Sequence, residues 1–246
     1  MAAVTVQFLG SGDAFGSGGR FQTCISVRAE EAHVLLDCGA STLIAMKRFS
    51  VDPSSVDAVV VSHLHGDHFG GIPFLVLDGQ FGHREKPLLI AGPPGIGERL
   101  ARAMEVLFPG SSTASRAFNV HLIELAPRTE TAVGGITVTG YEVVHPSGAP
   151  AYALRLRCED KVIAYSGDTE WTETLVDVAC AADLFICEAY FFEKTVKNHL
   201  AYATVRQHRK RLDCRRLVLT HMSADMLERR AEVNEELAED GLTLEV

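Results

Sequence analysis

The stretch VVVSHLHGDHFGG, residues 59–71, dominates the interpretation of this chain. It begins as an apolar strand and runs directly into His63, His65, Asp67 and His68, with two glycines after them. Burying such side chains without a shared partner costs several kcal/mol. Neutral imidazoles and carboxylates are the ligands that zinc and similar divalent ions accept. The stretch therefore predicts a metal-binding segment at the end of a buried strand.

The spacing within this segment predicts two neighbouring ions. His63 and His65 share a face of an extended segment, so they can bind one ion together. Gly66 lets the backbone turn, and the next two side chains can then face a second ion. Five apolar strands end on a histidine or aspartate, namely Asp37, His63, His145, Asp168 and His221. His145 and His221 are the natural further ligands, and Asp168 can bridge a pair of ions about 3.5–4 Å apart.

Length and composition predict one domain over residues 1–246. Of the 246 residues, 47% are hydrophobic and 22% charged, which is typical of a globular chain with a sizeable core. No apolar run is long enough to span a membrane, and no charged segment precedes an apolar leader. The six cysteines form no C-x-x-C pair and mostly lie in apolar runs, as expected of buried thiols in the reducing cytoplasm.

Charge argues against a nucleic-acid partner. The net charge is −9, whereas a protein that grips long nucleic acid usually carries a basic face. The basic run RQHRKRL, residues 206–212, is the exception, and we interpret it as the solvated face of a helix.

Hydrophobic periodicity predicts strands that alternate with helices in both halves of the chain. Strands are expected over 3–9, 22–28, 33–37, 57–62, 87–92, 118–125, 135–145, 151–158, 161–168, 184–190 and 216–221. Helices are expected over 41–49, 69–81, 96–108, 173–182, 203–212 and 225–239. Two sheets packed face to face, with helices outside, satisfy this pattern. The expected class is therefore mixed α/β (α+β).

The segment SHLHGDHFGG resembles the H-x-H-x-D-H signature of the metallo-β-lactamase superfamily. FLGSG, LLDCG, AGPPG, YSGDTE, ICEAYF, NHL and LTHMS follow the order seen in its RNase Z-like branch, so the resemblance covers nearly the whole chain. It implies a four-layer αββα sandwich with the metals at one edge, between the sheets. It assigns His63, His65 and His145 to one ion, Asp67, His68 and His221 to the other, and Asp168 to both. Zinc is the expected metal, and manganese or iron accepts the same ligand types.

The chain also departs from the RNase Z pattern. Those enzymes carry a long flexible arm that docks tRNA, between the equivalents of His145 and Asp168. Here only residues 146–167 lie between them, which is room for two strands. The missing arm and the negative charge argue against tRNA as a substrate. Flavodiiron enzymes carry Glu where this chain has His65, and true zinc β-lactamases use a Cys in the second site. Large RNA-cleaving members need an inserted domain.

Glu188 and His199 favour phosphodiester chemistry. In RNase Z-like phosphodiesterases, such a pair stands beside the metals. A histidine there can protonate a leaving alkoxide, and a carboxylate can orient the imidazole. The remaining lone histidines, His33, His83, His121 and His208, are expected to be core or surface residues.

These features predict a dinuclear metal-dependent hydrolase that acts on small or nucleotide-like phosphodiesters by attack of a metal-bound hydroxide. We expect Asp67, His199 and Glu188 to be catalytic. The expected partner is a small-molecule substrate, without tRNA or membrane, and the resemblance suggests a homodimer. A lactonase or thioesterase of this fold would share all the metal ligands, so that function stays open. RNase Z-type RNA processing and a non-catalytic metal-stabilised binding protein stay open as well.

Overall fold

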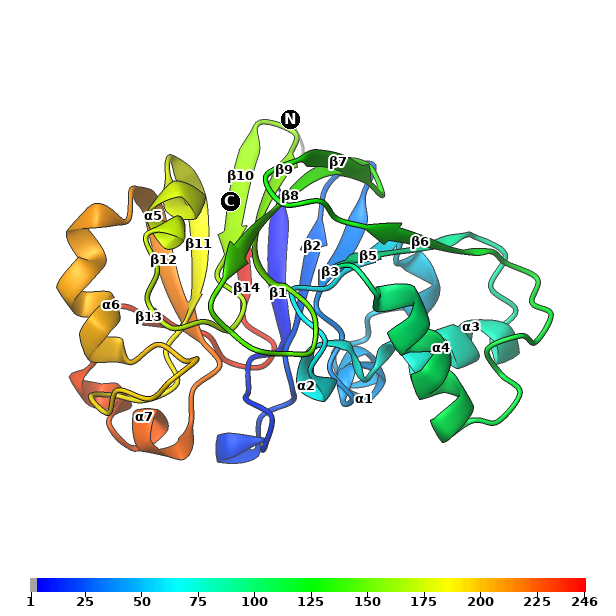
Figure 1. Ribbon diagram of the computed structural model, residues 1–246, viewed down its shortest axis with the longest axis horizontal. Helices are drawn as coiled ribbons and strands as arrows, with labels where there is room; N and C mark the ends of the chain where they lie inside the picture. The colour runs from blue at the N-terminus through cyan, green and yellow to red at the C-terminus, as the bar shows by residue number, and fades with distance from the viewer. Residues whose placement is uncertain (1–3) are drawn as a thin grey trace.

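Two sheets form the centre of the structure, a computed structural model that describes residues 4–246 (Figure 1). The first sheet comprises β1 (Thr5–Gly10), β2 (Cys24–Arg28), β3 (His33–Leu36), β4 (Ala58–Val60), β5 (Leu88–Gly92), β6 (Val120–Glu124) and β14 (Thr243–Glu245). The second comprises β7 (Glu130–Val133), β8 (Ile136–Val143), β9 (Ala151–Cys158), β10 (Lys161–Tyr165), β11 (Ala182–Glu188), β12 (Cys214–Thr220) and β13 (Glu236–Leu237). Their strand orders are β14-β1-β2-β3-β4-β5-β6 and β13-β12-β11-β10-β9-β8-β7.

Helices cover the outer face of each sheet. On the first sheet lie α1 (Thr42–Arg48), α2 (Gly66–Phe69), α3 (Ile72–Phe81) and α4 (Ile96–Leu107), at the right of Figure 1. On the second lie α5 (Thr174–Ala179), α6 (Tyr202–His208) and α7 (Ala224–Glu228), at the left. α4 begins after a proline and glycine turn, in which Gly95 adopts the left-handed conformation with φ of 86°. The order of layers is therefore helix, sheet, sheet, helix.

Strand alternation divides the apolar residues among three cores. In the segment that leads to the histidines, Ala58 and Val60 face the second sheet, whereas Val59 and Val61 pack under the helices. Successive residues of a strand point to opposite faces, so a strand buried on both faces reads as a continuous apolar run. The central core joins the sheets, and the third core holds α5, α6 and α7 on the second sheet.

Each sheet combines an antiparallel part with a parallel part. β3, β4, β5 and β6 are parallel neighbours in the first sheet, as are β10, β11, β12 and β13 in the second. β8 is separated from β10 by β9, which is antiparallel to both, so β8 and β10 run the same way. The carboxyl ends of these strands therefore meet at one edge of the second sheet, where ligands commonly bind in such folds.

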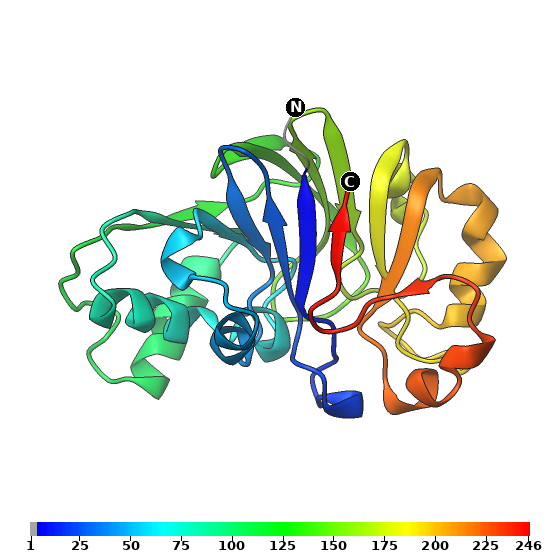
Figure 2. The same ribbon diagram turned by 180° about the vertical axis from the view of Figure 1, so that it is seen from behind.

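The first strand of the chain pairs with the last one in the first sheet. β14 pairs antiparallel with β1, and the two lie side by side at the centre of Figure 2. The predicted α/β class and the four-layer arrangement are confirmed. The predicted start of the first strand at residue 3 lies outside the described residues.

The helix predicted over 225–239 is wrong. α7 ends at Glu228, a short 3-10 turn covers Arg230–Glu232, and β13 then pairs parallel with β12. If the helix had continued, the free edge of β12 would have kept unpaired N–H and C=O groups. Pairing with β13 satisfies them. β7 and β14 were also absent from the predicted strands.

The structure also shows where the basic run and the six cysteines lie. Arg206, Lys210 and Arg211 are exposed, so the basic run lies on a solvated face. All six cysteines are free; Cys180 is exposed and Cys214 half-buried, and the other four are buried. Within residues 4–246, no helix has both the length and the apolar character that a membrane span requires.

Candidate metal centre

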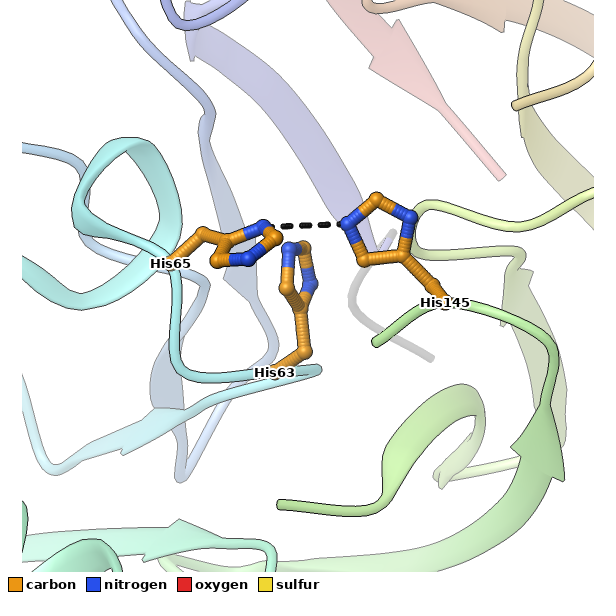
Figure 3. A group of neighbouring side chains, drawn as sticks. All are labelled: His63, His65 and His145. Carbon is orange, nitrogen blue, oxygen red and sulfur yellow. Dashed lines mark hydrogen bonds between the residues drawn. The ribbon is translucent and has the colours of Figure 1, made fainter. Parts of the chain in front are cut away.

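Three histidine rings converge at the edge between the sheets (Figure 3). His63 and His65 follow β4, and His145 follows β8. The ring centroids of each pair lie 4.7 to 4.9 Å apart, and Nδ1 of His65 is 3.0 Å from Nε2 of His145. Burial, together with the neighbouring imidazoles, lowers the pKa of His63 and of His65. These rings are therefore neutral at pH 7, which is the form that binds a metal.

A second group lies beside the first and contains both carboxylates. It comprises Asp67, His68, Asp168 and His221, all buried, with ligand atoms within 4.8 Å of one another. Nε2 of His68 lies 3.2 Å from Asp67 Oδ2 and 3.3 Å from Asp168 Oδ2. Burial would lower the pKa of His68 and of His221, but Asp168 raises both above the usual range. The negative charge of this group therefore attracts a proton or a cation.

Asp168 connects the two groups. Its Oδ2 lies 3.8 Å from His63 Nε2 and 3.9 Å from His145 Nε2 in the first group. The same oxygen lies 3.2 Å from His221 Nε2 in the second. Burial would raise the pKa of Asp168, but the neighbouring histidines hold it well below the usual range, so the side chain is a carboxylate. One carboxylate within reach of both groups fits the role of a bridging ligand.

Unsatisfied polar atoms test whether this site fits metal ions. His63 Nε2, His68 Nε2 and Asp168 Oδ1 are buried and have no hydrogen-bond partner among the described residues. Nearly all buried polar atoms in folded proteins are paired, so a cluster of unpaired ones requires an explanation. A divalent cation in each group would supply the missing partners. The His and Asp donors suit zinc, and manganese or iron fits the same chemistry.

Asp37 fixes His68 from behind. Its Oδ2 accepts a hydrogen bond of 2.7 Å from His68 Nδ1 and one of 2.9 Å from the Tyr165 hydroxyl. Ser62 donates two more, from its backbone N–H at 2.7 Å and its hydroxyl at 2.8 Å. The proton of His68 is thereby held on Nδ1, which leaves the lone pair of Nε2 for a metal. The sequence marks Asp37 as a polar residue at a strand end, but nothing in the sequence assigns this role.

Two further contacts orient ligand rings. The Asn198 carbonyl oxygen accepts a hydrogen bond of 2.8 Å from His145 Nδ1. The Thr23 hydroxyl donates to the Gly12 carbonyl, so it accepts a hydrogen bond of 3.2 Å from His221 Nδ1. In both rings Nε2 is therefore the atom available to a metal.

Three residues that follow strands at the site adopt the left-handed backbone conformation. Asp37 and His221, each immediately after a strand, both have φ of 58°. Gly167, before Asp168, has φ of 57°. Residues with a side chain rarely adopt this conformation, and such cases cluster at functional sites. The turns redirect the side chains from the sheet into the space between the two sheets.

Glu188 and His199 meet beside the two groups. Glu188 ends β11 and is fully buried, and its Oε2 lies 2.9 Å from His199 Nδ1. The other carboxylate oxygen accepts from the Thr169 backbone N–H. Ligand-type atoms of His199, His145 and Asp168 lie within 4.8 Å of one another. The His199 side chain is 22% exposed, so it stands at the border between the site and solvent.

Tyr190 supports His199, a contact that the sequence does not reveal. The two rings are stacked, with centroids 4.6 Å apart. Tyr190 lies two residues beyond Glu188, on the same face of an extended segment, and that spacing is the available signal. The structure thus brings together every site residue predicted from the sequence, and it adds Asp37, Thr23 and Tyr190 around them.

Of the other histidines, none lies in this cluster. His33 is buried at the start of β3, whereas His83 and His121 are exposed. The His208 ring stacks on Trp171 with centroids 3.8 Å apart.

Comparisons with known proteins agree with this geometry. Ribonuclease Z of Methanosarcina acetivorans is 27% identical over 271 residues, which cover 89% of this chain and 87% of the relative. The metallo-β-lactamase fold protein YhfI from Bacillus subtilis superposes with a TM-score of 0.82 at 21% identity over the whole of both chains. A diphosphatase of the PhnP family superposes with a TM-score of 0.76 at 19% identity, over 99% of this chain and 98% of the other.

Fold and relatives define a metal-dependent hydrolase, an RNase Z-like member of the metallo-β-lactamase superfamily. The predicted superfamily and enzyme class are confirmed. The family model described as Anti-Pycsar protein Apyc1 matches residues 4–241, and the chain belongs to that family.

Proposed function

We propose that this chain is a phosphodiesterase that acts on small or nucleotide-like phosphodiesters. Residues 1–246 would form one catalytic domain that holds two divalent ions, zinc in the first instance. His63, His65 and His145 would bind one ion, Asp67, His68 and His221 the other, and Asp168 both. The observation that carries the proposal is the contact between Glu188 and His199 at 2.9 Å, beside His145 and Asp168.

The Glu188–His199 pair has the properties of a proton donor. Burial raises the pKa of Glu188 well above its usual range, and the nearby Asp168 raises it further. A proton can therefore be shared between Glu188 Oε2 and His199 Nδ1, which lie 2.9 Å apart. Because Nδ1 of His199 faces Glu188, Nε2 is free to deliver a proton to the oxygen that leaves phosphorus. An alkoxide that leaves phosphorus needs such a proton, whereas the thiolate that leaves a thioester needs it less.

The remaining residues place the substrate and the attacking water. When bound, the two ions would activate that water and neutralise charge that develops on the phosphate. Burial would raise the pKa of Asp67, but His68 lowers it below the usual range, so the carboxylate is ionised. Asp67 can therefore hold an ion and accept a hydrogen bond from the water.

The segment between His145 and Asp168 favours a small substrate. It consists of β9, β10 and short connections, so it leaves no length for an extended arm. RNA remains the second candidate substrate, because the curated relative in Methanosarcina acetivorans is named Ribonuclease Z. A cytoplasmic location and a homodimer complete the proposal; light scattering on the purified protein measures the latter.

A hydrolysis panel on metal-replete protein tests the proposal. It contains bis-nitrophenyl phosphate, cyclic nucleotides with 2′,3′ and 3′,5′ rings, a lactone, a thioester and a precursor tRNA. We expect turnover of the phosphodiesters and no trimming of the tRNA at a defined 3′ site. Turnover confined to the lactone or thioester would replace the proposal with an esterase. Specific tRNA trimming would replace it with RNA processing.

A further inference from the structure

One peptide unit contacts a metal ligand and carries the backbone of the proton donor. Its carbonyl oxygen, from Asn198, accepts a hydrogen bond of 2.8 Å from His145 Nδ1. Its nitrogen belongs to His199, whose ring centroid lies 4.9 Å from that of His145. A peptide unit is planar and rigid, so a rotation that withdraws this carbonyl from His145 also moves His199. The orientation of this peptide therefore matters to both side chains.

The peptide lies at the end of a tight turn. Val196 and His199 form an antiparallel bridge, so Lys197 and Asn198 make the turn between them. Asn198 adopts the left-handed conformation, with φ of 70°. A common two-residue turn requires a positive φ at its second residue, and asparagine tolerates it. Lys197 is exposed, and a short surface turn moves readily unless another part of the chain holds it.

Glu170 holds this turn. Its Oε2 accepts a hydrogen bond of 3.3 Å from the Asn198 backbone N–H. Asn198 is therefore held on both sides of its Cα, at its N–H by Glu170 and at its carbonyl by His145. Glu170 is half-buried, and within residues 4–246 its carboxylate forms no ion pair that would draw it away from this N–H. The two contacts together restrict both backbone dihedrals of Asn198.

The backbone of Glu170 is itself fixed. Its N–H donates a hydrogen bond of 3.2 Å to the carbonyl of Val144, the residue before His145. The Thr169 hydroxyl accepts one of 3.1 Å from the Val144 N–H and donates one of 2.7 Å to the Glu170 carbonyl. The Thr169 N–H donates to the Glu188 carboxylate. Glu170 thus connects the end of β8 with the loop that carries the proton donor.

We propose that Glu170 is a positioning residue that acts through Asn198 on both His145 and His199. This inference rests on the proposed phosphodiesterase function and adds to it a residue outside both groups of metal ligands. Glu170 would keep Nε2 of His145 directed at its ion and hold His199 beside Glu188. Its loss should therefore impair metal binding and proton delivery together, whereas loss of His199 impairs proton delivery alone.

Metal-free protein provides the first test, by NMR of backbone amides and imidazole nitrogens. In the unmodified protein, His145 should carry its proton on Nδ1. In Glu170→Ala this Nδ1–H should exchange faster with solvent, and the Asn198 amide should exchange about tenfold faster, because a hydrogen bond to a charged acceptor is lost. Glu170→Gln should change less, since its amide oxygen still accepts. Glu130→Ala, which removes an exposed glutamate that pairs with Arg157, is the matched control.

Metal-replete protein provides the second test. Competition with a chelating dye should show one ion bound about three- to tenfold more weakly in Glu170→Ala. A direct partner of a ligand histidine contributes about 10- to 100-fold, and Glu170 acts one contact further away. At saturating metal, kcat/KM on alkyl phosphodiesters should fall about tenfold, a fraction of what a positioned acid contributes. On nitrophenyl phosphodiesters the loss should be about threefold or less. Glu170→Gln should recover part of both losses.

The inference and the proposed function can fail separately. If no phosphodiester is hydrolysed, the proposed function fails, and the NMR and dye measurements still test the link from Glu170 to His145. Unchanged exchange of the Asn198 amide and of the His145 Nδ1–H in Glu170→Ala would overturn that link. Equal losses on the two leaving groups would overturn the link to His199. Circular dichroism verifies the fold, and if Glu170→Ala does not fold, the same measurements on Glu170→Gln decide.

Discussion

The two ends of β3 place buried polar groups in opposite situations. His33, at its first residue, is satisfied on all sides: Nε2 and Nδ1 each lie 2.9 Å from a serine hydroxyl, of Ser26 and Ser55. Its backbone N–H donates to Asp57 at 2.8 Å. Beyond the other end, Asp37 holds His68, whose Nε2 faces the carboxylates of Asp67 and Asp168 and has no hydrogen-bond partner among residues 4–246. His33 and His68 are both buried histidines, and they differ in whether both ring nitrogens have hydrogen-bond partners.

This contrast shows what distinguishes a ligand histidine from a structural one. A buried imidazole with two hydrogen-bond partners needs nothing further. A buried imidazole fixed by one nitrogen and unpaired at the other requires a cation. Four predictions test the difference between the ends, in order of decreasing effect.

Removal of the shared carboxylate should affect the metal end most. Asp168→Ala should lower metal content below two ions per chain and reduce kcat/KM about 10⁴-fold or more, the order seen when part of a catalytic unit is removed. The fold should persist, because His33 and the cores do not depend on metal. Elemental analysis, circular dichroism and phosphodiesterase assays measure the three outcomes. Asp177→Ala, on the surface, is the control. Unchanged metal content in Asp168→Ala would remove Asp168 as a bridge.

The second prediction concerns proton delivery. His199→Ala should retain its metals and lose about 10²–10⁴-fold in kcat/KM on alkyl or nucleotide diesters, the usual contribution of a positioned acid. On nitrophenyl diesters, whose leaving group needs no proton, the loss should be much smaller. Glu188→Gln should show a milder version of the same pattern.

The control for that experiment is His121→Ala, an exposed histidine on β6. Its rates on both substrate types should match those of the unmodified protein. Equal losses on the two leaving groups in His199→Ala would exclude His199 as the acid and favour a lactonase.

The third prediction tests the group behind His68. Asp37→Asn should weaken metal binding about 10- to 100-fold, the usual effect of a lost partner behind a ligand histidine. Asparagine tolerates the left-handed backbone at this position, so strain does not confuse the result. Ser62→Ala removes a hydroxyl donor from Asp37 but keeps the contact with His68, so it should weaken binding less. Competition with a metal-sensitive chelating dye measures both. Equal affinity in Asp37→Asn and the unmodified protein would contradict this role.

The smallest expected effect is at His33. Burial, with help from Arg28, lowers the pKa of His33 to about 4 in the folded protein. The unfolded chain, with a pKa of about 6.5, binds more protons between these values, so this stability is complete above pH 6.5 and falls toward pH 4. The loss from pH 7 to pH 5 should be about 2 kcal/mol.

His33→Gln should remove this dependence. Metal release at low pH affects both proteins alike, so it cancels in the difference between their urea unfolding curves. Parallel stability losses in the two proteins between pH 7 and pH 5 would show that His33 does not titrate in this way.

The metal end of the fold could be predicted largely from the sequence. The H-x-H-x-D-H spacing places ligands on a turn after a buried strand, and the strand ends at His145, Asp168 and His221 complete the set. Such signals are local, because residue type and strand periodicity lie in adjacent positions. The apolar runs likewise indicate two sheets with helices outside.

The residues that support the ligands could not be predicted in this way. Thr23 reaches His221 across most of the chain, and the contact depends on how the sheets meet. The segment over 225–239 has helix-forming composition, but pairing with β12 makes part of it a strand. Contacts between segments far apart in the chain determine those features, and no local sequence pattern indicates such contacts.

The pairing of β14 with β1 has a consequence for synthesis. Asp240, just before β14, accepts hydrogen bonds from the Ser11 backbone and the Phe21 backbone, and the Ser11 carbonyl in turn accepts from His221 N–H. A ribosome makes β1 first and β14 last, so a nascent chain must hold an open strand edge through nearly all of its elongation. Open edges recruit other strands. Ribosome-bound chains that stop before residue 236 should therefore not bind a pair of metal ions, and added metal should not protect their β1 from protease. The full chain should gain both properties together on release.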